Sequence, residues 1–185
     1  MVQAIRRFCD RNGACLLVKA RQKMPVPSYL AAVADRCVYD ESSYQATILE
    51  ALSVAQLCIS FYSAAVMESI GLGVPHLTVG FPAHYYYDDD NPMNSLARFQ
   101  QFYDSQEGSL FRFQGAASLM SIPEAIYALP AKTLAGFRLA PESRKAYVAK
   151  YLGFDDGVSA GRVLDLVQRG AVGEPRRAAE AAAPT

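Results

Sequence analysis

Short runs of apolar residues alternate with longer segments of helical periodicity along this 185-residue chain. An apolar run without polar alternation is typical of a strand that is buried on both faces. Strands that alternate with helices predict a parallel sheet with helices packed on both of its faces. The predicted strands occupy residues 14–19, 36–40, 57–60, 75–81 and 108–114.

The intervening segments carry apolar residues at helical spacing, as Val2, Ile5 and Cys9 do near the N-terminus. We therefore predict an α/β fold, a Rossmann-like doubly wound parallel sheet with helices on both faces. The predicted helices occupy residues 1–11, 45–55, 64–72, 118–128, 141–152 and 158–169.

The element order begins with a helix, which raises a question about the centre of the sheet. In a doubly wound sheet of order 3-2-1-4-5-6 the first strand lies in the middle. If the helix at 1–11 follows that strand, the central strand is absent, and a gap separates the strand at 14–19 from the strand at 57–60. Unpaired backbone beside a gap is unfavourable. Three outcomes stay open: the chain is a piece of a longer protein, another segment fills the gap, or the sheet closes up directly.

Composition limits the classes of partner. Lys and Arg total 18 and Asp and Glu total 18, so no net charge favours nucleic acid or an anionic membrane. The four Cys show no CxxC spacing and no secretory leader is recognisable, which favours free thiols in a reducing compartment. The most apolar window, 54–67, is too short to span a bilayer. We expect a cytoplasmic protein; the basic helix at 1–11 leaves peripheral association with the inner face of a membrane as an alternative.

We expect one domain over residues 1–170, followed by a disordered tail over 171–185 that is rich in Ala, Pro and charge. No internal repeat is evident.

One segment, SFYSAAVMESIGLGVP at 60–75, carries a single carboxylate in an uncharged run. Ser63 is placed to cap the helix at 64–72, and Gly73 to end it as the C′ residue. The strand at 57–60 therefore leads directly into a helix N-terminus, at the edge of an α/β sheet where ligands bind and where phosphate is favoured.

Glu68 lies one turn into the predicted helix, on the same face as Ala64 and Ala65. Helical side chains lean toward the N-terminus, so its carboxylate can reach past two small residues toward a ligand at the cap. A phosphate at Ser63 with a ribose beside it would offer Glu68 two hydroxyl donors. The alternative is that Glu68 faces solvent.

The stretch YSAAVMESIGLGVP resembles the diphosphate-binding motif of GT-B type glycosyltransferases and their relatives. Those relatives include CDP-glycerol glycerophosphotransferases, capsule polysaccharide transferases and UDP-N-acetylglucosamine 2-epimerases. The shared pattern is a small Ser- or Gly-rich turn, then an acidic residue, then Gly-x-Pro leading into a strand. The resemblance covers roughly residues 1–82 and 141–169, and residues 83–140 match less well.

The resemblance implies roles for particular residues. Ser63 and the amide of Ala64, in the turn that Tyr62 begins, would hold the diphosphate, and Glu68 the ribose. By the same likeness, Lys19 and Arg21 at the end of the strand LLVKAR would point into the cleft. No metal or other cofactor is required by this scheme, in which the donor nucleotide is a substrate.

Several other residues are candidates at the strand ends. Tyr39 and Asp40 follow the second strand and can meet a nucleotide base. His84 lies in the loop after the fourth strand and is a candidate general acid or base. His76 opens an apolar strand and is more typical of a satisfied core histidine. The acidic run at 88–90 can bind Mg²⁺ but is also an ordinary turn composition.

The expected function is the nucleotide-sugar or CDP-glycerol binding half of a GT-B-like transferase in surface polysaccharide or teichoic-acid-like polymer synthesis. An N-terminal acceptor-binding domain, which the resemblance implies as a partner, would supply the catalytic base. Two alternatives stay open: a UDP-N-acetylglucosamine 2-epimerase-like enzyme, and a non-catalytic remnant or interaction domain of the same fold.

Overall fold

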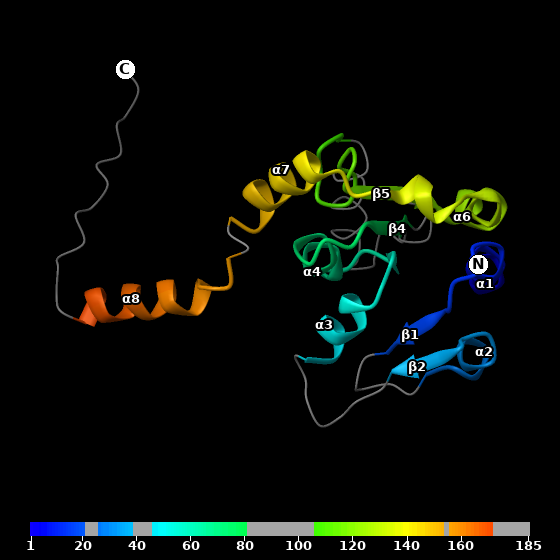
Figure 1. Ribbon diagram of the computed structural model, residues 1–185, viewed down its shortest axis with the longest axis horizontal. Helices are drawn as coiled ribbons and strands as arrows, with labels where there is room; N and C mark the ends of the chain where they lie inside the picture. The colour runs from blue at the N-terminus through cyan, green and yellow to red at the C-terminus, as the bar shows by residue number, and fades with distance from the viewer. Residues whose placement is uncertain (21–25, 39–45, 81–105, 154–155, 172–185) are drawn as a thin grey trace, which may run out of the picture. The chain divides into compact units, whose positions relative to one another are not determined.

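The computed structural model describes residues 1–20, 26–38, 46–80, 106–153 and 156–171 (Figure 1). The chain divides into two compact units, Met1–Gly153 and Phe154–Thr185. The sheets and the candidate site lie in the first unit, and the second is described separately below.

The first unit is an α/β fold of the Rossmann-like kind, with parallel strands in two sheets flanked by helices. One sheet pairs two strands, and the other has the order β3-β4-β5 (Figure 1). The predicted fold class is therefore confirmed. The strands are β1 (Leu17–Lys19), β2 (Arg36–Val38), β3 (Cys58–Ser60), β4 (His76–Gly80) and β5 (Ala117–Ser121).

Of the outcomes that the element order left open for the centre of the sheet, direct closure can be judged from the described residues. Among the described residues no ladder joins β1 to β3, so these two strands do not close up directly. The order β2-β1 on one side and β3-β4-β5 on the other matches a doubly wound sheet with its central position unfilled by any described strand.

Helices connect and cover the strands much as the periodicity predicts, with ends shifted by a few residues. A four-residue helix at Ser28–Ala31 was not predicted, because it contains no complete apolar repeat. The helices are α1 (Val2–Arg11), α2 (Ser28–Ala31), α3 (Ala46–Ser53), α4 (Ala65–Gly71), α6 (Ile122–Tyr127), α7 (Pro141–Tyr151) and α8 (Ser159–Ala171), with short 3₁₀ turns η2 (Leu129–Ala131) and η3 (Leu134–Phe137).

Two apolar clusters cover opposite faces of the β3-β4-β5 sheet, because successive strand residues point to opposite faces. Leu77 belongs to one cluster, while Ala117, paired in register with the neighbouring His76, belongs to the other. The α4 face buries Val66, Ile70, Phe111, Ala116, Ala117 and Tyr147. The α1 face buries Phe8, Cys9, Leu77, Leu129 and Phe137.

The prediction of a strand at 108–114 is wrong. The fifth strand is β5, which lies within the segment predicted as the start of a helix. Phe111 is buried with its ring edge-on to Tyr62, and Phe113 packs edge-on to Tyr147. Phe111 and Phe113 therefore pack in the core although the segment that carries them is not a strand. Gly115, at φ 75°, reverses the chain into β5.

The prediction that the strand at 14–19 is buried on both faces is also wrong. In β1, Leu17 and Val18 are half-buried and Lys19 is exposed. The described neighbour of β1 is the short strand β2, whose Arg36 and Cys37 are exposed. A strand with one short neighbour lacks the cover that a central strand receives.

The second unit contains α8, close to the helix predicted at 158–169. Before it, Asp156 accepts a hydrogen bond from the Val158 amide (3.1 Å) and forms an ion pair with Arg162. No helix among the described residues has the length and apolar character that crossing a membrane requires.

Candidate functional site

The candidate site begins where β3 ends at Ser60 and the chain turns into α4. Ser63 Oγ accepts a hydrogen bond from the Ala65 amide (3.3 Å), and the Ser63 carbonyl accepts one from the Val66 amide (3.2 Å). Ser63 thus makes a contact of the predicted kind. The helix itself starts one residue later than expected, with Ala64 in a helical conformation at its N-cap.

The end of α4 follows the predicted pattern closely. Gly73 has φ 83°, a left-handed conformation that glycine adopts without a steric penalty. The Val74 amide donates to the Ser69 carbonyl (2.8 Å) and the Gly73 amide to the Ile70 carbonyl (3.0 Å), which is the Schellman arrangement. The helix is therefore closed tightly before Pro75 leads into β4.

Tyr62 lies against the carboxyl end of β4. Its ring packs edge-on to Phe111, with centroids 5.1 Å apart. A Cβ placed on Gly80 would lie 2.7 Å from the Tyr62 hydroxyl oxygen, so the absence of a side chain at Gly80 admits the tyrosine. Tyr62 therefore follows the end of β3 and contacts the end of β4, the adjacent parallel strand. Its ring packs against the core cluster that contains Phe111.

Glu68 is exposed in the first turn of α4. Burial and, to a lesser extent, the negative charge of Glu68 together raise the pKa of the Cys58 thiol to about 11. The Glu68 carboxylate is therefore near enough to β3 for its charge to act on Cys58, and it is open to solvent. The ribose role and the solvent-facing alternative both require an exposed carboxylate, so each stays a prediction.

Beneath α4, a chain of hydrogen bonds joins Ser60, His76 and Ser69. His76 is 1 % exposed, with Nε2 2.9 Å from Ser60 Oγ and Nδ1 2.8 Å from Ser69 Oγ. Burial lowers the pKa of His76 to about 4, so the ring is neutral at pH 7. This confirms the interpretation of His76 as a satisfied core histidine.

Counting hydrogens assigns the tautomer of His76. A neutral imidazole has one N–H donor and one acceptor nitrogen. The buried Ser69 hydroxyl donates to the Val66 carbonyl (3.0 Å), so it accepts from Nδ1–H. Nε2 is then the acceptor. The Ser60 hydroxyl has one hydrogen, and in this arrangement it donates that hydrogen to Nε2 rather than to the Phe61 carbonyl. We assign this arrangement because it leaves neither ring nitrogen unpaired.

The same sheet face carries a further buried polar group. Thr78, two residues after His76 and paired in register with Ser60, is fully buried. Among the described residues its Oγ1 has no hydrogen-bond partner. A run of polar side chains therefore extends under α4 from His76 toward Gly80.

The remaining predicted residues fall elsewhere. Lys19 ends β1, in the other sheet, and its Nζ donates to the Ala20 carbonyl (3.0 Å). Arg21, Tyr39, Asp40 and His84 lie outside the described residues, as does the acidic run at 88–90. The structure therefore gives positions for Tyr62, Ser63, Ala64 and Glu68 as a group, and for Lys19 apart from them.

Sequence reasoning missed Gly80, Ser60 and Ser69. The sequence carried a signal for one of them: Gly80 lies inside the strand predicted at 75–81, and a glycine inside a strand often marks the close approach of another group. No local sequence pattern predicts the hydrogen bonds of Ser60 and Ser69 with His76, because these bonds depend on how α4 packs on the sheet.

In the part of the chain that the structure describes, no group of three or more His, Cys, Asp or Glu side chains is placed to hold a metal ion.

No protein-family model matches the chain, and no curated protein matches it either. The chemistry available at this edge is therefore read from its own residues: hydroxyls at 60, 62 and 63, backbone amides at the start of α4, and one exposed carboxylate.

Proposed function

We propose that this domain binds a nucleoside diphosphate donor, a nucleotide sugar or CDP-glycerol, as the nucleotide-binding half of a GT-B-like transferase. The observation that carries the proposal is the β3-α4-β4 unit. Its strands are parallel, its connecting turn holds Tyr62 and Ser63, and Glu68 is exposed one turn into the helix. Ligands of open α/β sheets bind at this carboxyl edge.

In this proposal Ser63 and the Ala64 amide contact the diphosphate, beside the Tyr62 hydroxyl. The Ser63 oxygen already accepts from Ala65, so its own hydrogen is oriented away from the helix and can be donated to a phosphate oxygen. Glu68 accepts hydrogen bonds from the ribose hydroxyls. Charge-assisted hydrogen bonds of this kind contribute about 1.5–3 kcal/mol.

The transfer step needs stabilisation of the negative charge on the departing nucleoside diphosphate. Hydrogen-bond donors and cations aimed at that charge supply it without reorganisation. The turn amides are donors of this kind, and Lys19 and Arg21 are the cations that the resemblance implies. The reaction class fits the synthesis of surface polysaccharide or of a teichoic-acid-like polymer, with the acceptor and the base held by a partner domain.

Titration calorimetry on the full chain with UDP, CDP, GDP and inorganic pyrophosphate tests this proposal. We expect at least one nucleoside diphosphate to bind, and Glu68→Ala to weaken that binding by roughly tenfold or more, which corresponds to about 1.4 kcal/mol. Pyrophosphate, which has no ribose, should bind the variant and the parent chain equally.

Glu50→Ala is the matched control, because Glu50 is an exposed glutamate on the neighbouring helix α3. It should leave every affinity unchanged. Absence of binding by all three nucleotides at millimolar concentration would contradict the proposal. An equal loss of pyrophosphate binding in Glu68→Ala would refute the ribose assignment.

A second candidate is a non-catalytic interaction domain of the same fold. The separation of β1 from β3 favours this second candidate. Because no hydrogen-bonded ladder joins the two sheets, the carboxyl ends of their strands are held less rigidly relative to each other. This candidate predicts that nucleotide binding is absent while the fold remains cooperative, which the same titrations and a thermal melt distinguish.

A further inference from the structure

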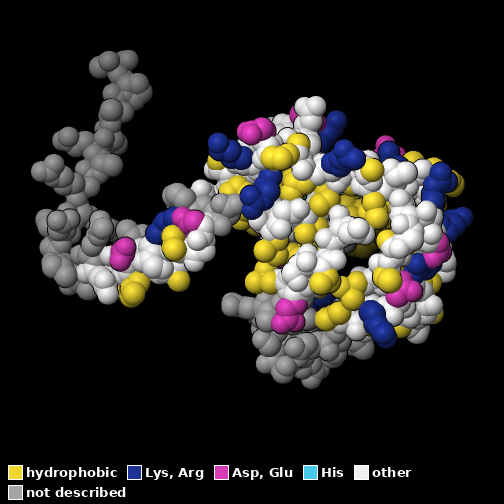
Figure 2. All heavy atoms as spheres, in the orientation of Figure 1, with side chains coloured by type: hydrophobic (Ala, Val, Ile, Leu, Met, Phe, Trp, Pro, Cys, Tyr) yellow, Lys and Arg dark blue, Asp and Glu magenta, His cyan; other side chains and the backbone are white. Residues whose placement is uncertain are grey.

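The last turn of α1 leads from the apolar core to the surface. Figure 2 shows hydrophobic side chains gathered in the middle of one face of the first unit, with Lys and Arg around them. Within α1, Phe8 is 2 % exposed and packs edge-on to Phe137 of η3, with ring centroids 5.8 Å apart. Asn12, at the C-cap one turn later, is half-buried, and Gly13 is exposed. Residues 12 and 13 therefore lie at the edge of this packed junction.

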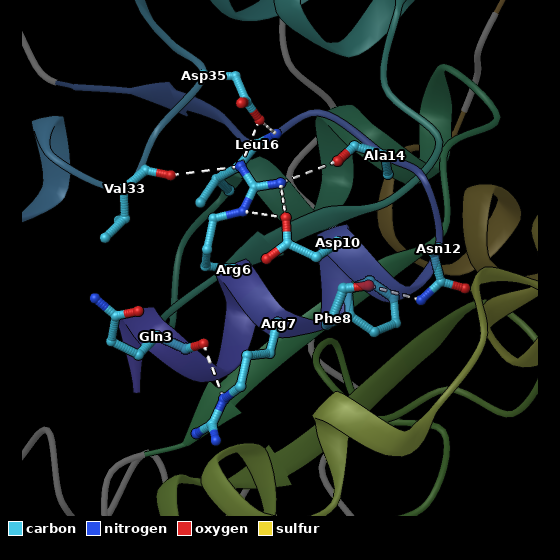
Figure 3. A network of polar contacts seen from close by, with 10 residues as sticks. All are labelled: Gln3, Arg6, Arg7, Phe8, Asp10, Asn12, Ala14, Leu16, Val33 and Asp35. Atoms are coloured by element: carbon cyan, nitrogen blue, oxygen red, sulfur yellow. Dashed lines mark hydrogen bonds and ion pairs between the residues drawn. The ribbon is translucent and has the colours of Figure 1, made fainter.

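The side chain of Asn12 joins α1 to the link between η2 and η3 by hydrogen bonds. Its Nδ2 donates to the Phe8 carbonyl (2.8 Å; Figure 3) and to the Lys132 carbonyl (3.2 Å). Its Oδ1 accepts from the Leu134 amide (2.9 Å). Because the Leu134 amide can only donate and the two carbonyls can only accept, these partners fix which end of the Asn12 side chain is nitrogen. The junction therefore needs an amide at this position rather than a carboxylate.

Asn12 is followed by Gly13, the sequence in which an asparagine side chain is most open to attack by the next backbone nitrogen. Glycine carries no side chain to hinder this approach, and a Cβ placed on Gly13 would meet no atom of the described residues within 4 Å. The attack requires Cγ of Asn12 to turn toward the Gly13 nitrogen. The hydrogen bonds of the Asn12 side chain oppose that rotation, and the Gly13 amide itself donates to the Asp10 carbonyl (3.3 Å). The folded junction therefore protects Asn12.

We propose that the Asn12-Gly13 sequence is a deamidation site that reacts when the end of α1 separates from residues 132–134, and that the product weakens this junction. The Gly13 nitrogen gives its proton to solvent base and bonds to Cγ of Asn12, while the Cγ–Nδ2 bond breaks and ammonia leaves with a proton taken from solvent. Water then adds to one of the two carbonyl carbons of the succinimide and opens the ring to aspartate or isoaspartate. One water is consumed and one ammonia is released, so no other reactant is needed.

The product is unfavourable at this position because of its charge. A carboxylate has no hydrogen to donate, so it would face the Phe8 and Lys132 carbonyl oxygens without bonding to them. Its negative charge would also lie at the C-terminus of α1, where the helix dipole favours cations. Isoaspartate in addition lengthens the backbone by a methylene group between α1 and β1. A junction that has opened and reacted therefore closes less firmly than before.

Ageing of the full chain at mildly alkaline pH, followed by mass spectrometry of the tryptic peptide 12–19, tests the modification site. We expect Asn12 to deamidate roughly tenfold or more slowly in the folded chain than in urea, because the reaction in the folded chain waits for local opening. Phe137→Ala, which removes the ring packed on Phe8, should raise the rate in the folded chain. Tyr127→Ala is the matched control, because this aromatic side chain is 83 % exposed, and it should leave the rate unchanged.

Asn12→Asp tests the effect of the product, and Asn12→Ala is its comparison because alanine loses the same hydrogen bonds without adding a charge. The midpoint of urea unfolding should fall in both variants, and at least as far in Asn12→Asp. Equal deamidation rates in the folded chain and in urea, or no deamidation in urea, would overturn the modification site. A midpoint for Asn12→Asp equal to that of the parent chain, or a smaller fall than in Asn12→Ala, would overturn the weakening of the junction. No nucleotide enters these measurements, so they stand independently of the proposed function.

Discussion

At the residue scale, the position of His76 beneath α4 couples the fold to pH. Its imidazole is neutral because burial opposes the charged form, and its two nitrogens are held by Ser60 and Ser69. In the unfolded chain the same group has its ordinary pKa near 6.5. The unfolded state therefore binds a proton more readily than the folded state between these two values.

We predict that the free energy of unfolding falls as the pH is lowered from about 6.5 to about 4, because protonation of His76 favours the unfolded chain in this window. At about 1.4 kcal/mol per pH unit the total loss from this residue is about 3 kcal/mol. Above pH 6.5 its contribution is complete. Urea denaturation at a series of pH values measures the effect.

His76→Asn is the comparison, because it keeps a polar side chain of similar reach without a titrating group. Its stability should be lower at neutral pH and should lack this part of the pH slope. A folded-state titration midpoint of His76 between pH 6 and 7, observed by NMR, would contradict the burial that the structure shows.

Among the secondary-structure elements, the fifth strand shows the limit of prediction from local pattern. It was predicted at 108–114, but the strand in the structure is β5. The strands ending at Lys19, Ser60 and Gly80 were predicted because each is an apolar run bounded by turn residues. β5 is a run of small residues, Ala-Ser-Leu-Met-Ser, with little strand character of its own. It is a strand because it pairs along the full length of β4, which is a tertiary effect.

A capping box sets the start of α6, which begins at Ile122, four residues later than the helix predicted at 118–128. Ser121 Oγ accepts from the Glu124 amide (3.4 Å), and Glu124 accepts from the Ser121 amide (2.7 Å). We predict that Ser121→Ala lowers the free energy of unfolding by about 1 kcal/mol. Ser53→Ala, an exposed serine at the end of α3, should change it by less than about 0.5 kcal/mol. Equal effects in thermal denaturation would remove the role assigned to this cap.

The candidate site shows the same division between local pattern and tertiary packing. The turn at Ser63 and the helix end at Gly73 follow from capping rules and were predicted. The contact of Tyr62 with Gly80 was not, because it joins residues in different strands. Arg21, Tyr39, Asp40 and His84 lie outside the described residues and stay predictions.

At the scale of the whole molecule, two parallel sheets share one unit through α1. The Arg6 guanidinium donates to Asp35 and Asp10, and together with the Leu16 amide it holds the pKa of Asp35 below its ordinary value (Figure 3). This network is the described polar link between α1 and the β1-β2 sheet. Its loss should therefore act on one sheet more than on the other.

We predict that Arg6→Met increases amide exchange in β1 and β2, at Val18 and Val38, and leaves Val79 in β4 unchanged. Methionine keeps an apolar stem but cannot pair with Asp35. Arg7→Met is the matched control, because Arg7 is exposed on the same helix and donates only to the Gln3 carbonyl among the contacts described for it. A uniform increase across both sheets would show that the network stabilises the whole fold instead.

We propose that the turn between β3 and α4, together with the end of β4, forms a nucleoside diphosphate site. A backbone NMR titration of the full chain with CDP, UDP and GDP tests it most directly. We expect saturable shifts that are largest at the amides of Ser63, Ala64 and Gly80 and small at Val148 in α7. Shifts centred elsewhere, or none at millimolar nucleotide, would contradict it.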